Sequence, residues 1–541
     1  MNKKIKPFLI ALPALLLLFI FRILPAFNSF VYSIKDMELE RRNLLFDNPT
    51  AGLRNYYEVF GSDNFTAAVG NTLLLSVLSV IVTCVLALVL ILCISMMPGR
   101  VLKTIAVIII AIPAFIPIVS YIFAYQKAFS VGSGFIGNVL MYFGLKPMAV
   151  FADPGAYPFL FVLMDSLRNV FVPVIIGVLA CESRNGRSSI VKALLVTAGY
   201  LAARATMLLS PDLDIIRASS GNFRNAGSVV MDSVTWNFMS GGQVEKAAAI
   251  WVLKTVVQLV ISVAVYFILC RLSPVITGSI GKPGEKQSQG SGTITGTIIG
   301  VIGYLLFAAG SAAVIALTFI PASGTIQGIR YLLGHDTFRR ACINTLIYSV
   351  CGSIIYGFMA LTLAYPMTVS RRVYPFILIL ISSLANNAAG EYYLGLMLGR
   401  VNPMLPVIIY SGLTVIGAFG LHFSVSCSTG DVPDSAGGYF RAALRPLAVI
   451  TVLSFIMIWG SYNYQYIYIS KESLYGLGMF DINMYAPAQV SDTEETVMLI
   501  NNIVNGYSLI TSVIPAAIGA VIIALNKFLP LTAFGVYARK G

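Results

Sequence analysis

The chain has 541 residues, of which 57% are hydrophobic and only 11% are charged, whereas a soluble domain carries about a quarter charged residues. Apolar runs of about 20 residues recur along it, and each is long enough to cross a bilayer as a helix. The formal net charge of +13 does not call for a nucleic-acid partner, because its distribution fits a membrane topology. The composition therefore predicts an all-α, polytopic membrane protein.

Taken from the N-terminus, the chain is expected to contain about twelve transmembrane helices. The predicted spans are residues 8–33, 71–96, 102–125, 156–181, 189–210, 245–271, 294–320, 341–369, 373–398, 403–426, 442–463 and 506–529. With the N-terminus in the cytoplasm, the cytoplasmic segments hold seventeen Lys and Arg but four acids. This bias follows the positive-inside rule and predicts a multi-pass plasma-membrane protein with both termini in the cytoplasm.

A pattern of matching residues divides the chain into two similar halves. Asn71-Thr72-Leu73 matches Asn344-Thr345-Leu346 at an offset of 273 residues, and further matches share that offset. Several matches at one offset favour two copies of one unit. We predict a first half at 1–275, a cytoplasmic Gly/Ser-rich linker at 276–293 and a second half at 294–541, each half with about six helices. Parallel repeats are a common plan among transporters.

Polar residues within the predicted spans are candidates for a solute path. Asp165 and Arg168 lie three positions apart, so they share a helix face and can pair with each other or line a path. Asn386, Asn387 and Glu391 supply hydrogen-bond donors and acceptors in the ninth span. Sugar hydroxyls need such groups, although polar contacts between helices are a competing use.

The segment "WGSYNYQYIYISK" is dense in aromatic residues. Trp459, Tyr462, Asn463 and Tyr464 are candidates for an external gate, while an aromatic belt at the membrane interface has the same composition. Neither His335 nor His422 has partners at the spacing of metal ligands or of a catalytic group. We therefore predict no metal site and no enzymatic activity.

Several segments together carry a resemblance to a known family. They are "GLRNYYEVFGSDNFTAAVGNTLLLSV", "DLDIIRASSGNFRNAGSVVMDSVTWNFMSGGQVEKAAAIWVLKTVVQLV", "WGSYNYQYIYISKESLYGLGMF" and the terminal "NKFLPLTAFGVYARKG". In these segments the chain resembles the maltose-type permeases, with the MetI-like fold, of ABC importers for sugars and oligosaccharides. Such permeases usually pair as two different subunits, and the two halves here resemble that pair fused in one chain.

The resemblance implies partners for this chain. A sugar substrate would arrive from an extracellular solute-binding protein, and cytoplasmic ATP-binding subunits would drive import. The chain has no G-x-x-x-x-G-K-[ST] loop to hold ATP phosphates. ATP would therefore bind to partner subunits, and no cofactor is expected on this chain.

The loops that couple family members to their ATPases depart from the family pattern. The family's E-A-A…D-G-A motif is missing from both halves, and only remnants match it. These remnants are Glu182 and Gly186 in the first half, and Asp431, Asp434, Gly437 and Phe440 in the second. Either the ATPases have a shallower docking surface, or coupling to ATP hydrolysis is lost, or the loops are simply short turns.

Three functions therefore follow as hypotheses. The first is the permease of a sugar or oligosaccharide ABC importer. The second is a permease-derived scaffold, sensor or accessory subunit that has lost its ATPase coupling. The third, an ion- or proton-coupled secondary transporter, rests on the charges within the predicted spans.

Overall fold

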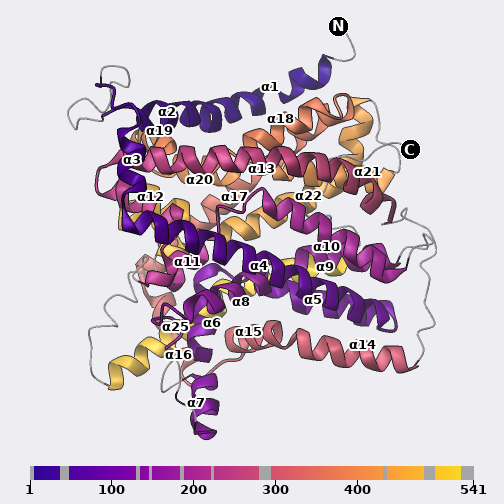
Figure 1. Cartoon of the computed structure of the whole chain (residues 1–541). Helices are drawn as coiled ribbons and strands as arrows, with labels where there is room; N and C mark the ends of the chain where they lie inside the picture. Colours follow the sequence, from indigo (N-terminus) through magenta and orange to yellow (C-terminus); the bar gives the residue numbers. More distant parts are fainter. Residues whose placement is uncertain are drawn as a thin grey trace.

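The computed structural model describes ten segments of the chain. They are residues 5–36, 48–129, 134–144, 146, 149–182, 188–220, 225–279, 294–429, 435–479 and 494–525. These residues form helices and turns, with one isolated β-bridge between Lys35 and Thr50. The long helices lie roughly parallel to one another in Figure 1. The prediction of an all-α, polytopic membrane protein is confirmed.

Within these ten segments, six helices are long and apolar enough to cross a membrane, and the number rises to ten if each of four bent helix pairs is one span. Two predicted spans lie outside these ten. One corresponds to α10 (Ser189–Ala205), which has 17 residues. The other corresponds to α18 (Val373–Ser382) and α19 (Ala388–Val401), which are separated by a turn. Breaks within the spans are thus a general feature of this bundle.

The first half is described up to residue 279. Its elements are α1 (Lys6–Leu18), the π-helix η1 (Phe19–Ile23), α2 (Leu24–Ser33), α3 (Arg54–Phe60), α4 (Asp63–Met96), α5 (Arg100–Phe115), α6 (Ile118–Phe129), α7 (Phe135–Tyr142), α8 (Tyr157–Asn169), α9 (Phe171–Glu182), α10, α11 (Leu213–Ser219), η2 (Ala226–Ser228), α12 (Met231–Ser240) and α13 (Val244–Ser279).

The second half is described from residue 294. Its elements are α14 (Ile294–Phe307), α15 (Ala309–Phe319), α16 (Thr325–Gly334), α17 (Asp336–Ala364), η3 (Tyr365–Thr368), α18, α19, α20 (Leu405–Gly412), α21 (Ile416–Thr429), α22 (Ala436–Trp459), α23 (Asn463–Tyr468), η4 (Glu472–Leu474) and α25 (Glu494–Leu525).

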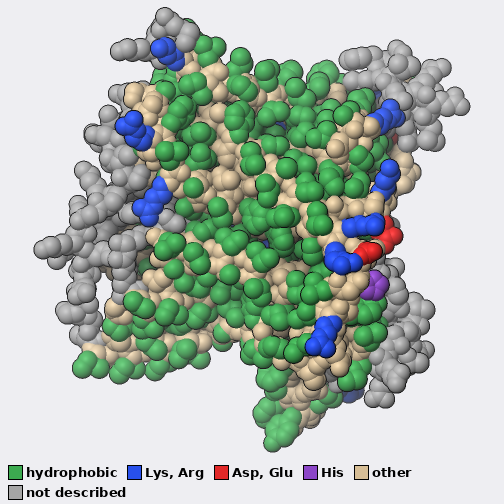
Figure 2. Space-filling model, turned by 180° about the vertical axis from the view of Figure 1, so that it is seen from behind, with side chains coloured by type: hydrophobic (Ala, Val, Ile, Leu, Met, Phe, Trp, Pro, Cys, Tyr) green, Lys and Arg blue, Asp and Glu red, His purple; other side chains and the backbone are tan. Residues whose placement is uncertain are grey.

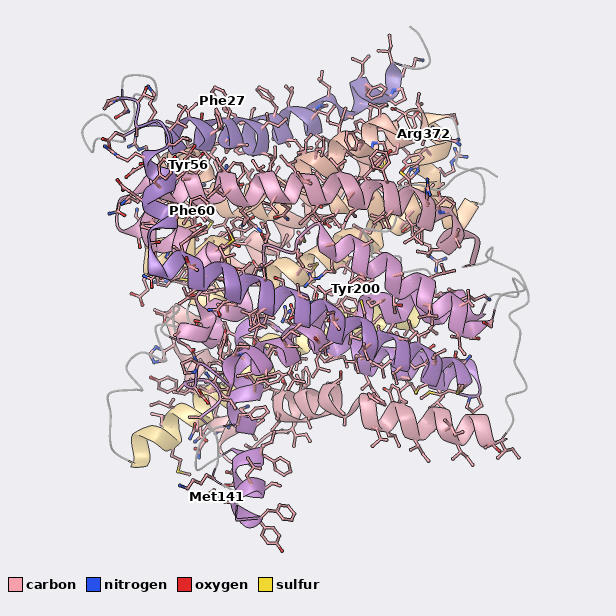
Figure 3. All side chains as sticks on the ribbon, in the orientation of Figure 1. Phe27, Tyr56, Phe60, Met141, Tyr200 and Arg372 are labelled. Carbon is pink, nitrogen blue, oxygen red and sulfur yellow. The ribbon has the colours of Figure 1, made fainter. Side chains whose placement is uncertain are left out.

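The outer surface is apolar over a broad band. Figure 2 shows a face covered with hydrophobic side chains, with Lys and Arg gathered toward two opposite margins. Phe27 on α2 and Met141 on α7 lie at the periphery in Figure 3, and their exposed fractions are 51% and 44%. A soluble protein would bury such side chains, whereas lipid tails solvate them.

The two halves pack together through their first helices. α14 packs against α4, and α15 packs against α5 and α6, whereas α1 contacts α17 and α2 contacts α19. Each half therefore has its first helix in contact with the other half, and α2 also packs against α13 of its own half. The three largest hydrophobic clusters of the described residues each contain side chains from both halves.

Small residues permit the close contact of α14 with α4. A Cβ atom added at Gly300 would lie 2.8 Å from the carbonyl oxygen of Cys93, and one added at Gly303 would lie 2.7 Å from its sulfur. No side chain fits at such distances. The Gly-x-x-Gly spacing here thus serves close helix packing, as its small residues predict.

A repeated asparagine–threonine pair braces α4 and α17. Asn71 donates two hydrogen bonds, of 3.1 and 3.0 Å, to backbone carbonyls beside η2. Asn344 donates two, of 3.0 Å each, to backbone carbonyls beside η4. Thr72 and Thr345 each accept a hydrogen bond from a backbone amide of the same segment, at 2.9 and 2.8 Å. Two residues 273 positions apart thus make the same contacts.

Candidate functional site: a polar cavity between the halves

A cavity of about 310 Å³ lies where the two halves meet. The first half lines it with Arg204, Met207, Ser210, Pro211, Asp212, Leu213, Asp214, Arg217, Asp232, Thr235 and Trp236. The second half lines it with Asn386, Ala388, Glu391, Ser461, Tyr464, Ile467 and Tyr468. Six of these eighteen residues are Asp, Glu or Arg, which is unusual for a membrane interior.

Breaks in the helices bring this polar lining into the bundle. α10 ends at Ala205, and residues 206–212 connect it to the short α11. α18 ends at Ser382, and residues 383–387 connect it to α19. Irregular backbone at membrane depth is tolerated where it is buried in protein or faces a polar cavity. Both connections contribute residues to the cavity wall.

The turn before α19 is strained at a residue that lines the cavity. Asn386 has φ 57°, and it is the only non-glycine residue with positive φ in the described part of the chain. Asn tolerates this left-handed conformation better than most residues do. The next residue, Asn387, caps α19 by accepting a hydrogen bond of 3.0 Å from the amide of Gly390. The turn thereby sets the direction in which α19 starts.

The contact of α2 with α19 contains a buried ion pair. Arg22 lies in η1 and forms a salt bridge with Glu391, which is in the first turn of α19. Their side chains are 9% and 4% exposed. Ser29 donates a hydrogen bond of 2.7 Å to Asn387 in the same contact. These bonds join the first span to the wall of the cavity.

The π-helix η1 has a local cause in the sequence. Pro25 is the second residue after η1. It lacks a backbone N–H, so it cannot donate the usual helical bond to Phe21. Such irregular turns are frequent at functional sites. Here the irregular turn carries Arg22, whose guanidinium forms the salt bridge to the cavity wall.

Two further ion pairs lie at the wall in the first half. Arg204 lies 3.4 Å from Asp165, whose side chain is 2% exposed, and Lys254 forms a salt bridge with Asp232. Asp165 also accepts a hydrogen bond of 2.9 Å from Asn169. In each of these pairs one member lines the cavity and the other lies behind it.

Aromatic faces complete the lining. The guanidinium of Arg217 lies over the rings of Trp236 and Tyr466, at 5.1 and 4.6 Å from their centroids. Burial lowers the pKa of Arg217, and Tyr462 and Asp214 act in the opposite direction. An arginine nevertheless stays protonated at neutral pH.

A tyrosine stack forms the wall of the second half. The ring of Tyr410 lies nearly parallel to those of Tyr464 and Tyr468, at 5.9 and 5.4 Å between centroids. The latter two rings line the cavity. Flat aromatic faces of this kind suit the apolar faces of ring-shaped solutes.

Of the predicted path residues, Asn386, Glu391 and Tyr464 line the cavity together. Asn387 lies behind them in the α2–α19 contact. Asp165 takes part through Arg204, which is not the partner that its sequence spacing suggests.

The other predicted path residues have contacts elsewhere. Arg168 donates a hydrogen bond of 3.1 Å to the carbonyl of Ile116. Trp459 donates one of 3.1 Å to a carbonyl of α25. Tyr462 is buried and packs on the ring of Tyr466. Asn463 begins α23, and its side chain lies outside the described residues.

The residues matched to the coupling motif fall largely outside the described part. Gly186, Asp431 and Asp434 are not described, and neither is the side chain of Glu182. Gly437 and Phe440 lie in the first turns of α22, where the ring of Phe440 packs 5.5 Å from that of Tyr365. Only six residues connect α9 to α10 (183–188), and six connect α21 to α22 (430–435).

Several cavity residues had no part in the path predicted from the sequence. The largest group comes from the segment between α10 and α13, namely Asp212, Asp214, Arg217, Asp232 and Trp236. A run of charged and aromatic residues between two spans was the available signal. In the described part of the chain, no group of three or more His, Cys, Asp or Glu residues is placed to hold a metal ion.

Comparisons with known proteins give only distant likenesses. No family model matches the chain, and no curated protein matches it. Among solved structures, a chain of a bacterial alginate ABC transporter in complex with an alginate pentasaccharide-bound periplasmic protein is 20% identical, with a TM-score of 0.37; the match covers 41% of this chain and 83% of that one. A chain of a bacterial ABC transporter involved in the import of the acidic polysaccharide alginate is also 20% identical, with a TM-score of 0.38 and coverage of 41% and 85%. Likenesses this weak do not establish a shared activity.

Proposed function

We propose that this chain is the membrane-spanning permease of an ABC importer and forms the translocation path for a sugar or oligosaccharide. The observation that carries the proposal is the polar cavity inside an apolar helical bundle, lined by both halves of the chain. Solute sites of transporters lie at the interface of repeats, where broken helices expose polar groups. The turns before α11 and α19 have that character.

The lining suits a carbohydrate. Carboxylates, arginines and the amide of Asn386 offer acceptors and donors for hydroxyl groups. The rings of Trp236, Tyr464 and Tyr468 offer flat apolar faces. A few oriented polar groups among aromatic side chains are typical of small-molecule sites.

The repeated order of elements supports two fused MetI-like units. In each half a long helix of 29 or 34 residues, α17 or α4, follows a first span and a short helix. Each then leads into interrupted spans and ends in a last helix of 32 or 36 residues. The matching bonds of Asn71 and Asn344 support the same relationship. Rocking of one unit against the other would expose the cavity alternately to the two sides.

The proposal includes partners on both sides of the membrane. An extracellular binding protein would deliver the sugar, and cytoplasmic ATP-binding subunits would drive the rocking motion. Hydrolysis of ATP would take place on those subunits, so this chain would have no enzymatic role.

One observation favours a second function. The connections from α9 to α10 and from α21 to α22 have six residues each, and a single helical turn takes about 3.6 residues. A separate coupling helix is hard to build within such lengths. A permease-derived scaffold, sensor or accessory subunit without ATPase coupling is therefore the alternative.

Copurification followed by reconstitution separates these functions. The full chain is isolated from its native membranes in mild detergent, and its partners are identified by mass spectrometry. The preparation is then placed in proteoliposomes, and uptake of radiolabelled saccharides of one to four units is measured with and without ATP. We expect an ATPase in the complex and uptake that requires ATP.

Two other results would favour the rivals. Absence of an ATPase together with absence of ATP-dependent uptake would favour the scaffold. Uptake that survives ATP depletion but collapses with an ionophore would favour an ion-coupled transporter. A Glu391→Gln variant tests whether the cavity is the path. We expect it to retain the same partners as the wild-type chain while its uptake of saccharides changes.

A further inference from the structure

Three of the charged residues that line the cavity form ion pairs with oppositely charged residues that lie behind the wall. Glu391 is backed by Arg22, Asp232 by Lys254 and Arg204 by Asp165. The three backing side chains are 9%, 3% and 2% exposed. This arrangement is repeated on three different elements of the wall, in both halves of the chain.

The remaining lining charges belong to α11 and its cap. Asp212 caps α11 by accepting hydrogen bonds of 3.0 and 3.2 Å from two backbone amides. Asp214 and Arg217 lie three positions apart on α11, so they share a face of that helix. The guanidinium of Arg217 also lies over the rings of Trp236 and Tyr466. Its position is thus set by the protein itself.

Taken together, five carboxylates and four cations form the lining and its backing, which leaves a formal balance of one negative charge. A carboxylate-bearing solute would lose its hydration on entering the cavity. A cation of the wall would have to compensate that loss by pairing with the carboxylate. Arg204 is already paired with Asp165, and the guanidinium of Arg217 already lies over the rings of Trp236 and Tyr466. A hydroxyl group has no such requirement, and the paired side chains keep donors and acceptors for it.

We propose that the cavity selects neutral, polyhydroxylated solutes and excludes acidic ones, because its lining charges are compensated from behind and leave a slight negative excess. This inference rests on the proposed function, since it concerns the solute path. It also makes Arg22, Lys254 and Asp165 determinants of selectivity although they stand behind the wall.

Charged thiol reagents can measure this selectivity without knowledge of the natural solute. Ser461→Cys and Ala388→Cys each place a thiol in the cavity wall, and no described native cysteine lines the cavity. The full chain in lipid nanodiscs is treated with anionic, cationic or neutral methanethiosulfonates. The rate at which each reagent modifies the introduced cysteine is divided by its rate with a free thiol in solution. It is then corrected for labelling of the wild-type chain.

We expect the anionic reagent to react about three- to tenfold more slowly than the neutral one, since one excess charge acts across a few ångströms at intermediate dielectric. The cationic reagent should match or exceed the neutral one. An anionic rate equal to or above the neutral rate would overturn the proposal. Failure of all three reagents would overturn it as well, because it requires a cavity open to water.

Removing one lining carboxylate should reverse the preference. Asp232→Asn leaves Lys254 uncompensated, and Glu391→Gln leaves Arg22 uncompensated. Each is expected to raise the anionic rate at least threefold. Asp336→Asn serves as the matched control, because Asp336 is 71% exposed and does not line the cavity. An unchanged anionic rate in both cavity variants would contradict compensation from behind.

These rates are independent of partners and of ATP. A chain that fails to take up sugar with an ATPase, but rejects the anionic reagent, would contradict the proposed function and leave the charge selectivity standing. A chain that imports with ATP, yet reacts freely with the anionic reagent, would contradict only the selectivity.

Discussion

Arg22 shows how one buried charge constrains its surroundings. A lone guanidinium within an apolar span is costly, and the salt bridge to Glu391 offsets that cost. The pair joins residues separated by 369 positions. Removing one member leaves the other charged in the bundle interior, whereas removing both leaves only a loss of packing.

We therefore expect Arg22→Met and Glu391→Gln each to destabilise the protein by about 3 kcal/mol. The double variant should lose clearly less than the sum of the two. Thermal denaturation in mild detergent provides the measurement. Arg54→Met, which removes an exposed cation from α3, is the matched control and should change the midpoint little. Additive losses in the double variant would show that the two charges do not stabilise each other.

Asn386 gives a second prediction at the scale of one residue. Its φ of 57° is available to Gly without cost but is unfavourable for a β-branched side chain. Asn386→Val should destabilise the protein by roughly 1–2 kcal/mol, and Asn386→Gly by little or nothing. The same denaturation assay compares them. Equal midpoints for both variants would mean that the turn before α19 relaxes freely.

At the scale of elements, α4 and α17 are braced in the same way. The amide of Asn71 or Asn344 donates to two carbonyls that follow a distant connection in the same half. Buried carbonyls are costly without donors, and the asparagine supplies donors to them. The brace fixes where each connection returns to its long helix.

Asn71→Ala and Asn344→Ala are expected to cost about 2 kcal/mol each, because each removes two hydrogen bonds. Limited proteolysis of the segments around η2 and η4, alongside thermal denaturation, would reveal the loosened connection in the half that is altered. The control is Asn64→Ala, since Asn64 is exposed on α4. A large loss for one variant and none for the other would argue that the two braces are not equivalent.

At the scale of the whole molecule, contacts of each half's first helices with the other half hold the two halves together. The contacts of α14 with α4 and of α2 with α19 are extensive, and hydrophobic clusters cross the seam. The covalent linker is then not needed to keep the halves in place. Packing in the bilayer should suffice.

A protease site inserted within 280–293 tests this. After cleavage in mild detergent, we expect the two fragments to migrate as one species in size-exclusion chromatography. Uncut protein provides the reference for its elution volume. Separation of the fragments would show that the contacts between the halves are weak.

Hydrophobicity was sufficient to predict the helical class and most of the spans. Length alone misjudged continuity, because the breaks near Phe115, Ser382 and Gly412 lie within stretches that were each predicted to be one span. Asn386 and Glu391 were predicted because polar groups are rare in spans, and Tyr464 was predicted because its segment is dense in aromatic residues; all three line the cavity.

Charges such as Asp212 and Arg217 were passed over because they lie between spans, where charge is ordinary. Only tertiary folding brings α11 to the cavity. The ion pair of Asp165 with Arg204 could likewise not be predicted from the sequence. The spacing of three residues along one helix suggested Arg168 as the partner of Asp165 instead.

The separation of Arg22 from Glu391 has a consequence for biosynthesis. A ribosome adds about 5–20 residues per second, so Glu391 emerges on the order of 20 to 70 s after Arg22. During that interval the first helix is in the membrane before Glu391 is available to pair with Arg22. Water, lipid headgroups or the insertion machinery must solvate the guanidinium until then. Completion of the nascent first half thus waits for translation of the second.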